Sequence, residues 1–147
     1  MVQIRGAAIY VNSLLSAYIP IHNDVFGANI RHLIPIPGIF KKINYCQHRE
    51  SLAQISSQLQ LRQAEAVKAA SEGGGQAHLA SVLAEYIRAL NVTVTQLQGM
   101  SDLLCRKAQG EHSYSMYAYN RDCERYNKLV EQYRQIGNSL NEVMRGW

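Results

Sequence analysis

Proline is absent from the C-terminal two thirds of the chain. Pro20, Pro35 and Pro37 all lie within residues 1–45, and residues 46–147 contain none. Proline breaks helices, whereas the Ala, Leu, Gln, Glu, Lys and Arg that are abundant in residues 46–147 favour them. We therefore divide the chain into an N-terminal region, residues 1–45, and a helical region, residues 46–147.

Cysteine is scarce, with only Cys46, Cys105 and Cys123, and no two of them have a short paired spacing. This argues against a secreted disulfide scaffold and favours a reducing, cytoplasmic location. One pairing is conceivable, because Cys105 and Cys123 would lie level on antiparallel helices if the chain reversed near residue 114. A bond between them would instead indicate a secreted or periplasmic protein.

Long runs of one charge or of apolar residues are also missing. The net charge of +4 comes from 15 Lys and Arg against 11 Asp and Glu, which are interspersed. The absence of a block of five like charges argues against a nucleic-acid-binding arm. No segment reaches about 18 uninterrupted apolar residues, so we expect no transmembrane helix. The basic excess lies in residues 1–50, where we expect any attraction to anionic partners.

Glycine divides the helical region into three segments. The glycines of "SEGGG" (71–75) and Gly110 interrupt helices, because glycine loses much conformational entropy there. The sequence therefore predicts an all-α fold, either an antiparallel three-helix bundle or a long helical hairpin, with helices at about 48–71, 76–108 and 113–145. The β-branched run "NVTVT" (91–95) leaves open a break of the middle helix near residues 91–101, although the apolar spacing favours a helix.

Apolar residues recur at alternating steps of three and four along the second and third predicted helices. Such a stripe predicts buried positions in a core or an interface. The residues that we assign to it are Leu83, Leu90, Leu97, Tyr119, Tyr126, Tyr133, Leu140 and Trp147. A parallel column of Leu129, Ile136 and Val143 widens the apolar face of the third helix, which suits coverage by two neighbours.

The sequence of the N-terminal region predicts two short helices that pack on the end of the bundle. The first has one apolar face, made by Ala7, Val11, Leu14 and Tyr18, and is expected to end at Pro20. The second would begin near Asn23 or Asp24. "IPIPGIF" (34–40) is expected to be extended, since a residue that precedes proline avoids the helical region.

The sequence contains no pattern that is typical of an active site. The five histidines lack metal-ligand spacing, no C-x-x-C occurs, and "SEGGGQ" lacks the lysine of a phosphate-binding loop. Cys123 lies on the apolar stripe, which favours a buried hydrophobe over a nucleophile. We therefore expect no catalytic residue, metal or cofactor. Tyr114 and Tyr117, in or beside the predicted loop, are candidates for contact with a partner, and packing against neighbouring residues of the chain is an equally good interpretation.

These observations favour a non-enzymatic helical interaction or assembly protein, which binds itself or a protein partner through an apolar helix face. One alternative is a small helical chaperone or immunity-type protein that binds one client. Another is a peripheral membrane protein that uses residues 1–45, where an amphipathic run (7–19) is followed by the basic "FKK" (40–42).

Overall fold

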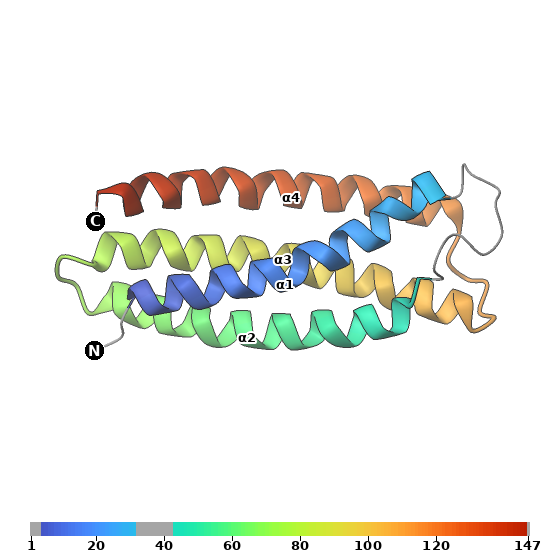
Figure 1. Cartoon of the computed structure of the whole chain (residues 1–147), viewed down its shortest axis with the longest axis horizontal. Helices are drawn as coiled ribbons and strands as arrows, with labels where there is room; N and C mark the ends of the chain where they lie inside the picture. The colour runs from blue at the N-terminus through green and yellow to red at the C-terminus, as the bar shows by residue number, and fades with distance from the viewer. Residues whose placement is uncertain (1–3, 32–42, 147) are drawn as a thin grey trace.

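The described residues of the chain form four long helices that alternate in direction along one bundle (Figure 1). The computed structural model describes residues 4–31 and 43–146. The helices are α1 (Ile4–Arg31), α2 (Tyr45–Ser71), α3 (Ala77–Ala108) and α4 (Met116–Arg145). No strand occurs in these described residues. The predicted all-helical class is therefore confirmed.

Capping side chains mark the starts of α2 and α4, and glycines mark the turn between α2 and α3. The side chains of Asn44 and Ser115 cap α2 and α4, where each accepts a hydrogen bond from a backbone N–H, at 3.0 and 3.1 Å. Gly73 and Gly74, with φ of +75° and +80°, reverse the chain between α2 and α3, because glycine tolerates this conformation without strain. The three helices begin and end within three residues of the predicted bounds, and α3 continues without a break.

The prediction of two short N-terminal helices is wrong. α1 is a single helix of 28 residues with Pro20 inside it. Pro20 has no N–H to donate, so one helical hydrogen bond is missing. However, the apolar spacing continues beyond it, and Tyr18, Ile21 and Val25 are all buried. Packing on both sides of Pro20 thus offsets the lost bond. The extended connector predicted at 34–40 lies outside the described residues.

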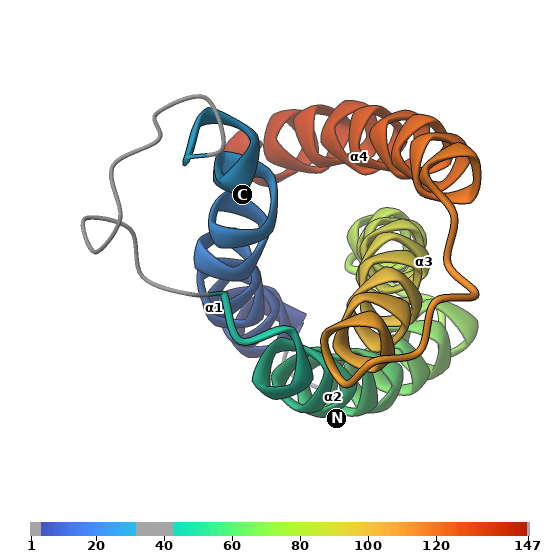
Figure 2. The same ribbon diagram turned by 90° about the vertical axis from the view of Figure 1, so that its right-hand side faces the viewer.

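α3 is the central helix of the bundle. It packs against the other three helices, and the end-on view in Figure 2 shows it between α2 and α4, with α1 on the opposite side. Its fully buried apolar stripe consists of Leu83, Ile87, Leu90, Val94 and Leu97. Burial of a side chain of this size contributes about 1.5–3 kcal/mol. The stripe of α3 therefore supplies much of the shared core.

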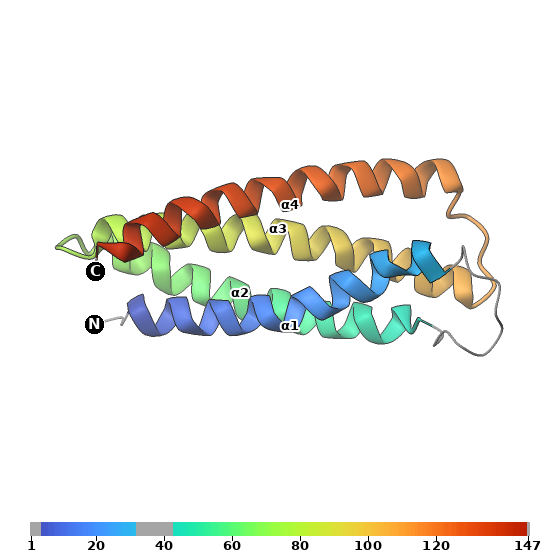
Figure 3. The same cartoon turned by 45° about the horizontal axis from the view of Figure 1, so that its top comes forward.

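α1 and α4 face each other across a wider seam. In the described part of the chain, no Cα atom of α1 lies within 8 Å of a Cα atom of α4. Figure 3 shows the reason: α4 lies on one side of α3, while α1 and α2 lie on the other. Closely packed helices have axes about 8–10 Å apart. The α1–α4 seam is wider, so large side chains must fill it or it must stay open.

Candidate functional site

The residues that we predicted as a core or interface stripe lie mostly inside the bundle. Six of them are buried: Leu83, Leu90, Leu97, Tyr126, Tyr133 and Leu140. Tyr119 is half-buried at the edge of the core, and Trp147 lies outside the described residues. The buried tyrosines of α4 are therefore covered by helices of the same chain.

Aromatic side chains fill the middle of the α1–α4 seam. The ring of Tyr126 from α4 stacks on Phe26 and His22 from α1, with centroids 5.0 and 5.6 Å apart. Tyr133 meets Tyr18 edge to face at 6.3 Å. These are favourable geometries for aromatic pairs. We call these five residues the aromatic bridge.

Hydrogen bonds run through the aromatic bridge. The hydroxyl of Tyr126 is hydrogen-bonded to the hydroxyl of Tyr18 and, at 2.7 Å, to Nδ1 of His22. Burial raises the pKa of both tyrosines above the usual range, so both phenols are neutral. Burial and, secondarily, the positive charge of Arg134 lower the pKa of His22. The two phenols and Nδ1 of His22 are therefore hydrogen-bonded to one another without a net charge.

Beyond the aromatic bridge, the seam between α1 and α4 is open. A hollow of about 410 Å³ lies there, with α3 as its floor and α1 and α4 as its walls. Most of its lining is apolar, including Ala8, Leu15, Leu83, Tyr86, Leu140 and Met144. The volume falls within the range of about 300–1,000 Å³ that is common for binding sites.

Gly137 of α4 shapes this hollow. A Cβ atom at this position would lie 3.1 Å from Cε2 of Tyr86, so glycine leaves room for the ring to lie against α4. Tyr86 is buried, and burial raises its pKa to about 12. The floor of the hollow therefore presents a neutral aromatic ring.

Two smaller hollows extend the first along the same seam. One, of about 270 Å³, shares Leu15 and Tyr86 with it and reaches Arg134. The other, of about 220 Å³, shares Met144 and reaches Arg5. Together the three hollows form one feature, which we call the α1–α4 groove.

The edge of the α1–α4 groove carries exposed apolar side chains. Ile9 is 65% exposed and lines the central hollow, and Ile19 is 42% exposed and lines the hollow at Arg134. Single exposed apolar residues are common on protein surfaces. Ile9 and Ile19, however, border an apolar groove. Together with the groove lining they form a larger apolar surface that a ligand can cover.

A larger hollow, of about 540 Å³, lies between α1 and α2, and five of its nine lining residues are polar. Three glutamines line it, Gln47, Gln54 and Gln58, and Gln58 accepts a hydrogen bond from Tyr10 at 3.1 Å. His48, which also lines it, is hydrogen-bonded to Asp24 at 2.6 Å. None of the lining residues is a large exposed apolar side chain. For this reason the α1–α4 groove is the better candidate for a binding site.

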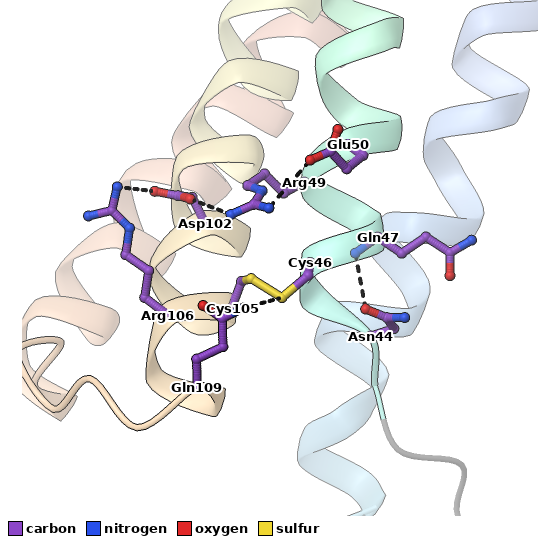
Figure 4. A network of polar contacts seen from close by, with 9 residues as sticks. All are labelled: Asn44, Cys46, Gln47, Arg49, Glu50, Asp102, Cys105, Arg106 and Gln109. Atoms are coloured by element: carbon purple, nitrogen blue, oxygen red, sulfur yellow. Dashed lines mark hydrogen bonds and ion pairs between the residues drawn. A yellow bond between two sulfur atoms is a disulfide. The ribbon is translucent and has the colours of Figure 1, made fainter.

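The disulfide joins Cys46 to Cys105 (Figure 4), so the pairing of Cys105 with Cys123 that the sequence suggested is wrong. Because α2 and α3 are antiparallel neighbours, the start of α2 meets the end of α3, and the two Cα atoms are 4.9 Å apart. Cys123 is free and half-buried. Burial raises the pKa of Cys123, which disfavours a reactive thiolate.

An ion-pair network lies beside the disulfide (Figure 4). Asp102 of α3 accepts a hydrogen bond from Arg49 of α2 at 3.0 Å and pairs with Arg106 at 3.2 Å. Exposed pairs of this kind contribute about 0.2–1 kcal/mol each. The covalent bond and the network therefore fasten the same end of the α2–α3 hairpin.

The two loop tyrosines have different environments. Tyr114 is buried, and its hydroxyl donates a hydrogen bond to Asp122 at 2.6 Å. Partner contact is therefore not supported for Tyr114, because its ring packs within the chain against Tyr119. Tyr117 is 72% exposed, with the guanidinium of Arg121 5.8 Å from its ring centroid. Of the two, Tyr117 alone offers a surface to a partner.

Within residues 4–31 and 43–146, no three His, Cys, Asp or Glu side chains gather as a metal site. None of the four described helices combines the length and hydrophobicity that a membrane-spanning segment needs. No protein-family model, curated protein or solved structure matches this chain. The α1–α4 groove is thus the feature from which function is best inferred.

Proposed function

We propose that this protein is a non-enzymatic interaction protein that receives the apolar face of a helix in the α1–α4 groove. The observation that carries the proposal is the open apolar groove, with buried α3 side chains as its floor and the exposed Ile9 and Ile19 on its edge. Helices bind such grooves through apolar side chains at positions i, i+3 or i+4, and i+7. The incoming helix belongs to a partner protein or to a second copy.

A small chaperone or an immunity-type protein binds one client, and such a client would occupy the same groove. The burial of Tyr126, Tyr133 and Leu140 within the chain supports this form over self-assembly, because these residues no longer need a second copy to cover them. Membrane binding through residues 1–45 has less support. Ala7, Val11 and Tyr18, on the apolar face of α1, are buried in the bundle core.

The Cys46–Cys105 disulfide supports a function in an oxidising compartment. Disulfides persist outside the cell or in the periplasm and are rare where thiols are kept reduced. We therefore favour a secreted or periplasmic interaction protein over a cytoplasmic one.

Photo-crosslinking tests whether the groove is a binding site. A photoreactive amino acid replaces Ile19 on the groove edge in one variant. In the control it replaces Leu61, a similarly exposed apolar residue of α2 that lines neither the α1–α4 groove nor the hollow between α1 and α2. Both variants are expressed in the source cells and irradiated, and crosslinked products are identified by mass spectrometry.

We expect a discrete protein adduct from position 19 that position 61 does not give. An adduct with the chain itself would identify a second copy as the occupant. Equal labelling from the two positions, or labelling of lipid alone, would refute protein binding in the groove.

A further inference from the structure

Positive charge lies at both ends of the α1–α4 groove. Arg5 lines the hollow at one end, and Arg134, next to His22, lines the hollow at the other. Between them the polar lining residues include the neutral amides of Asn12 and Asn141. None of the described residues that line the groove is an aspartate or a glutamate.

Both arginines are available to a ligand. Neither forms an ion pair with another described residue, and both side chains are exposed. The charge of Arg134 acts on His22, Tyr18 and Tyr126, which places it close to the aromatic bridge. An arginine in this position can bind a carboxylate through two parallel hydrogen bonds.

The length of the groove suits a helix. Along α1 it runs from Arg5 to Asn23, a distance of about 27 Å at about 1.5 Å per residue, or about five helical turns. α1 and α4 remain close enough for the aromatic bridge to join them, so an entire helix does not fit between them. The groove instead accepts the row of side chains on one face of a helix that lies across it.

We infer that the partner is an amphipathic helix of another protein, with an apolar ridge and a carboxylate near each end that pairs with Arg5 or Arg134. This inference rests on the proposed function and specifies the chemistry of the ligand. Apolar side chains supply most of the affinity, while the charges select an acidic helix over a basic one.

A second copy of this chain fits less well. Its net charge of +4 would oppose approach to the positive ends of the groove. Outside the groove, the exposed Leu61 and Val67 lie six residues apart on α2 and Val92 lies on α3, so these residues do not form a ridge with helical spacing. The helix is therefore supplied by a different, acidic protein.

Two synthetic helical peptides of about 18 residues test the charge preference. They share one ridge of leucine and alanine, and they carry either glutamates or lysines near both ends. Binding to the intact, oxidised protein is measured by fluorescence anisotropy at low and high salt. We expect the glutamate peptide to bind about tenfold more tightly at low salt, with a smaller difference at high salt because ions screen exposed charges.

Arg134→Glu tests which charge is responsible, and Lys128→Glu is its matched control. Lys128 is an exposed residue of α4 that does not line the groove, and both variants change the net charge equally. We expect Arg134→Glu to weaken binding of the glutamate peptide several-fold and to strengthen binding of the lysine peptide. Equal effects of the two variants would overturn the inference.

Two tryptophan variants, one inside the groove and one beside it, distinguish failure of this inference from failure of the proposed function. Asn12 is exposed and lines the groove, whereas its neighbour Ser13 is exposed and does not. If both peptides bind equally and Asn12→Trp weakens both more than Ser13→Trp, the groove binds helices but the acidic partner is refuted. If neither peptide binds, or if Asn12→Trp changes nothing, the inference and the proposed function both fail.

Discussion

The hydroxyl of Tyr126 makes two hydrogen bonds within the aromatic bridge, one to Tyr18 and one to His22. These contacts join α1 to α4, whose described backbones stay farther apart than those of tightly packed helices. His22 lies close to the positive charge of Arg134. Protonation of His22 would therefore place a second positive charge at the centre of the seam.

We expect the free energy of unfolding to fall as the pH drops, because of His22. Its pKa in the folded protein is lowered from the ordinary 6.5, chiefly by burial. As the pH falls through 6.5, His22 is therefore protonated in the unfolded chain before it is protonated in the folded protein. The free energy of unfolding decreases over this range, and the decrease ends below the pKa of His22 in the folded protein. Urea denaturation between about pH 8 and pH 5 measures this dependence.

His22→Gln is the control, because it keeps a hydrogen-bonding group beside Tyr126 but cannot titrate. The variant should lose less stability than the wild-type protein over the same pH range. If the two proteins lost stability equally, His22 would not be responsible.

At the scale of single residues, sequence spacing predicts burial better than it predicts contacts. The steps of three and four placed Tyr126 and Tyr133 on a stripe whose positions the structure buries. The same spacing did not indicate their partners on α1, since the contact depends on the angle at which the helices cross. For Tyr114 the spacing left partner contact and local packing open, and the structure shows local packing, with a hydrogen bond to Asp122 in the following helix.

Two glycines inside helices differ in what surrounds them. Gly99 of α3 is exposed, and an added Cβ atom would meet nothing within 4 Å. At Gly137 of α4 it would press on the ring of Tyr86. The effect of an alanine substitution on stability therefore depends on helix propensity alone at Gly99. At Gly137 it also depends on packing beside the groove.

We expect Gly99→Ala to stabilise the protein by about 1 kcal/mol, the difference in helix propensity. Gly137→Ala should gain less, because the ring of Tyr86 must move by a few tenths of an ångström. Urea denaturation of both variants gives the difference directly. An equal gain would contradict the assigned Tyr86 contact.

The disulfide between α2 and α3 should contribute much of the stability. The bond links residues that are 59 positions apart, and loop entropy predicts a loss of about 4 kcal/mol when it is removed. We expect this loss in urea denaturation of the double variant Cys46→Ser, Cys105→Ser. Cys123→Ser, which breaks no bond, serves as the control and should cost about 1 kcal/mol or less.

At the scale of whole elements, glycine predicted the helix end correctly at the turn after α2, but proline did not predict the length of α1. The glycines at 73–75 ended α2 as expected. Pro20 suggested a break, but Ile21 and Val25 continue the apolar spacing of Tyr18, and packing prevailed. The position of Cys46, 28 residues before Gly74, nearly matches that of Cys105, 31 residues after it. Because the two cysteines are nearly equidistant from the turn, they lie level on antiparallel helices, and this spacing could have predicted the Cys46–Cys105 pair.

At the scale of the whole molecule, the four helices cover the buried stripe without a second copy. We therefore expect a monomer of 16.6 kDa by light scattering after size exclusion, at every concentration and with or without reductant. A dimer that Asn12→Trp disrupts and Ser13→Trp does not would show that a second copy occupies the groove. The groove itself could not be predicted from the sequence, because it arises from the wide spacing of α1 and α4.

The disulfide also determines how the molecule would respond to a pulling force. Cys46 and Cys105 close α2, the glycine turn and α3 into a covalent ring, to which α1 and α4 are attached at the same end. Tension between the two termini would pass from α1 through the sulfur atoms directly into α4. The segment inside the ring would bear no load, and about 200 Å of extended chain would stay hidden until the bond was reduced.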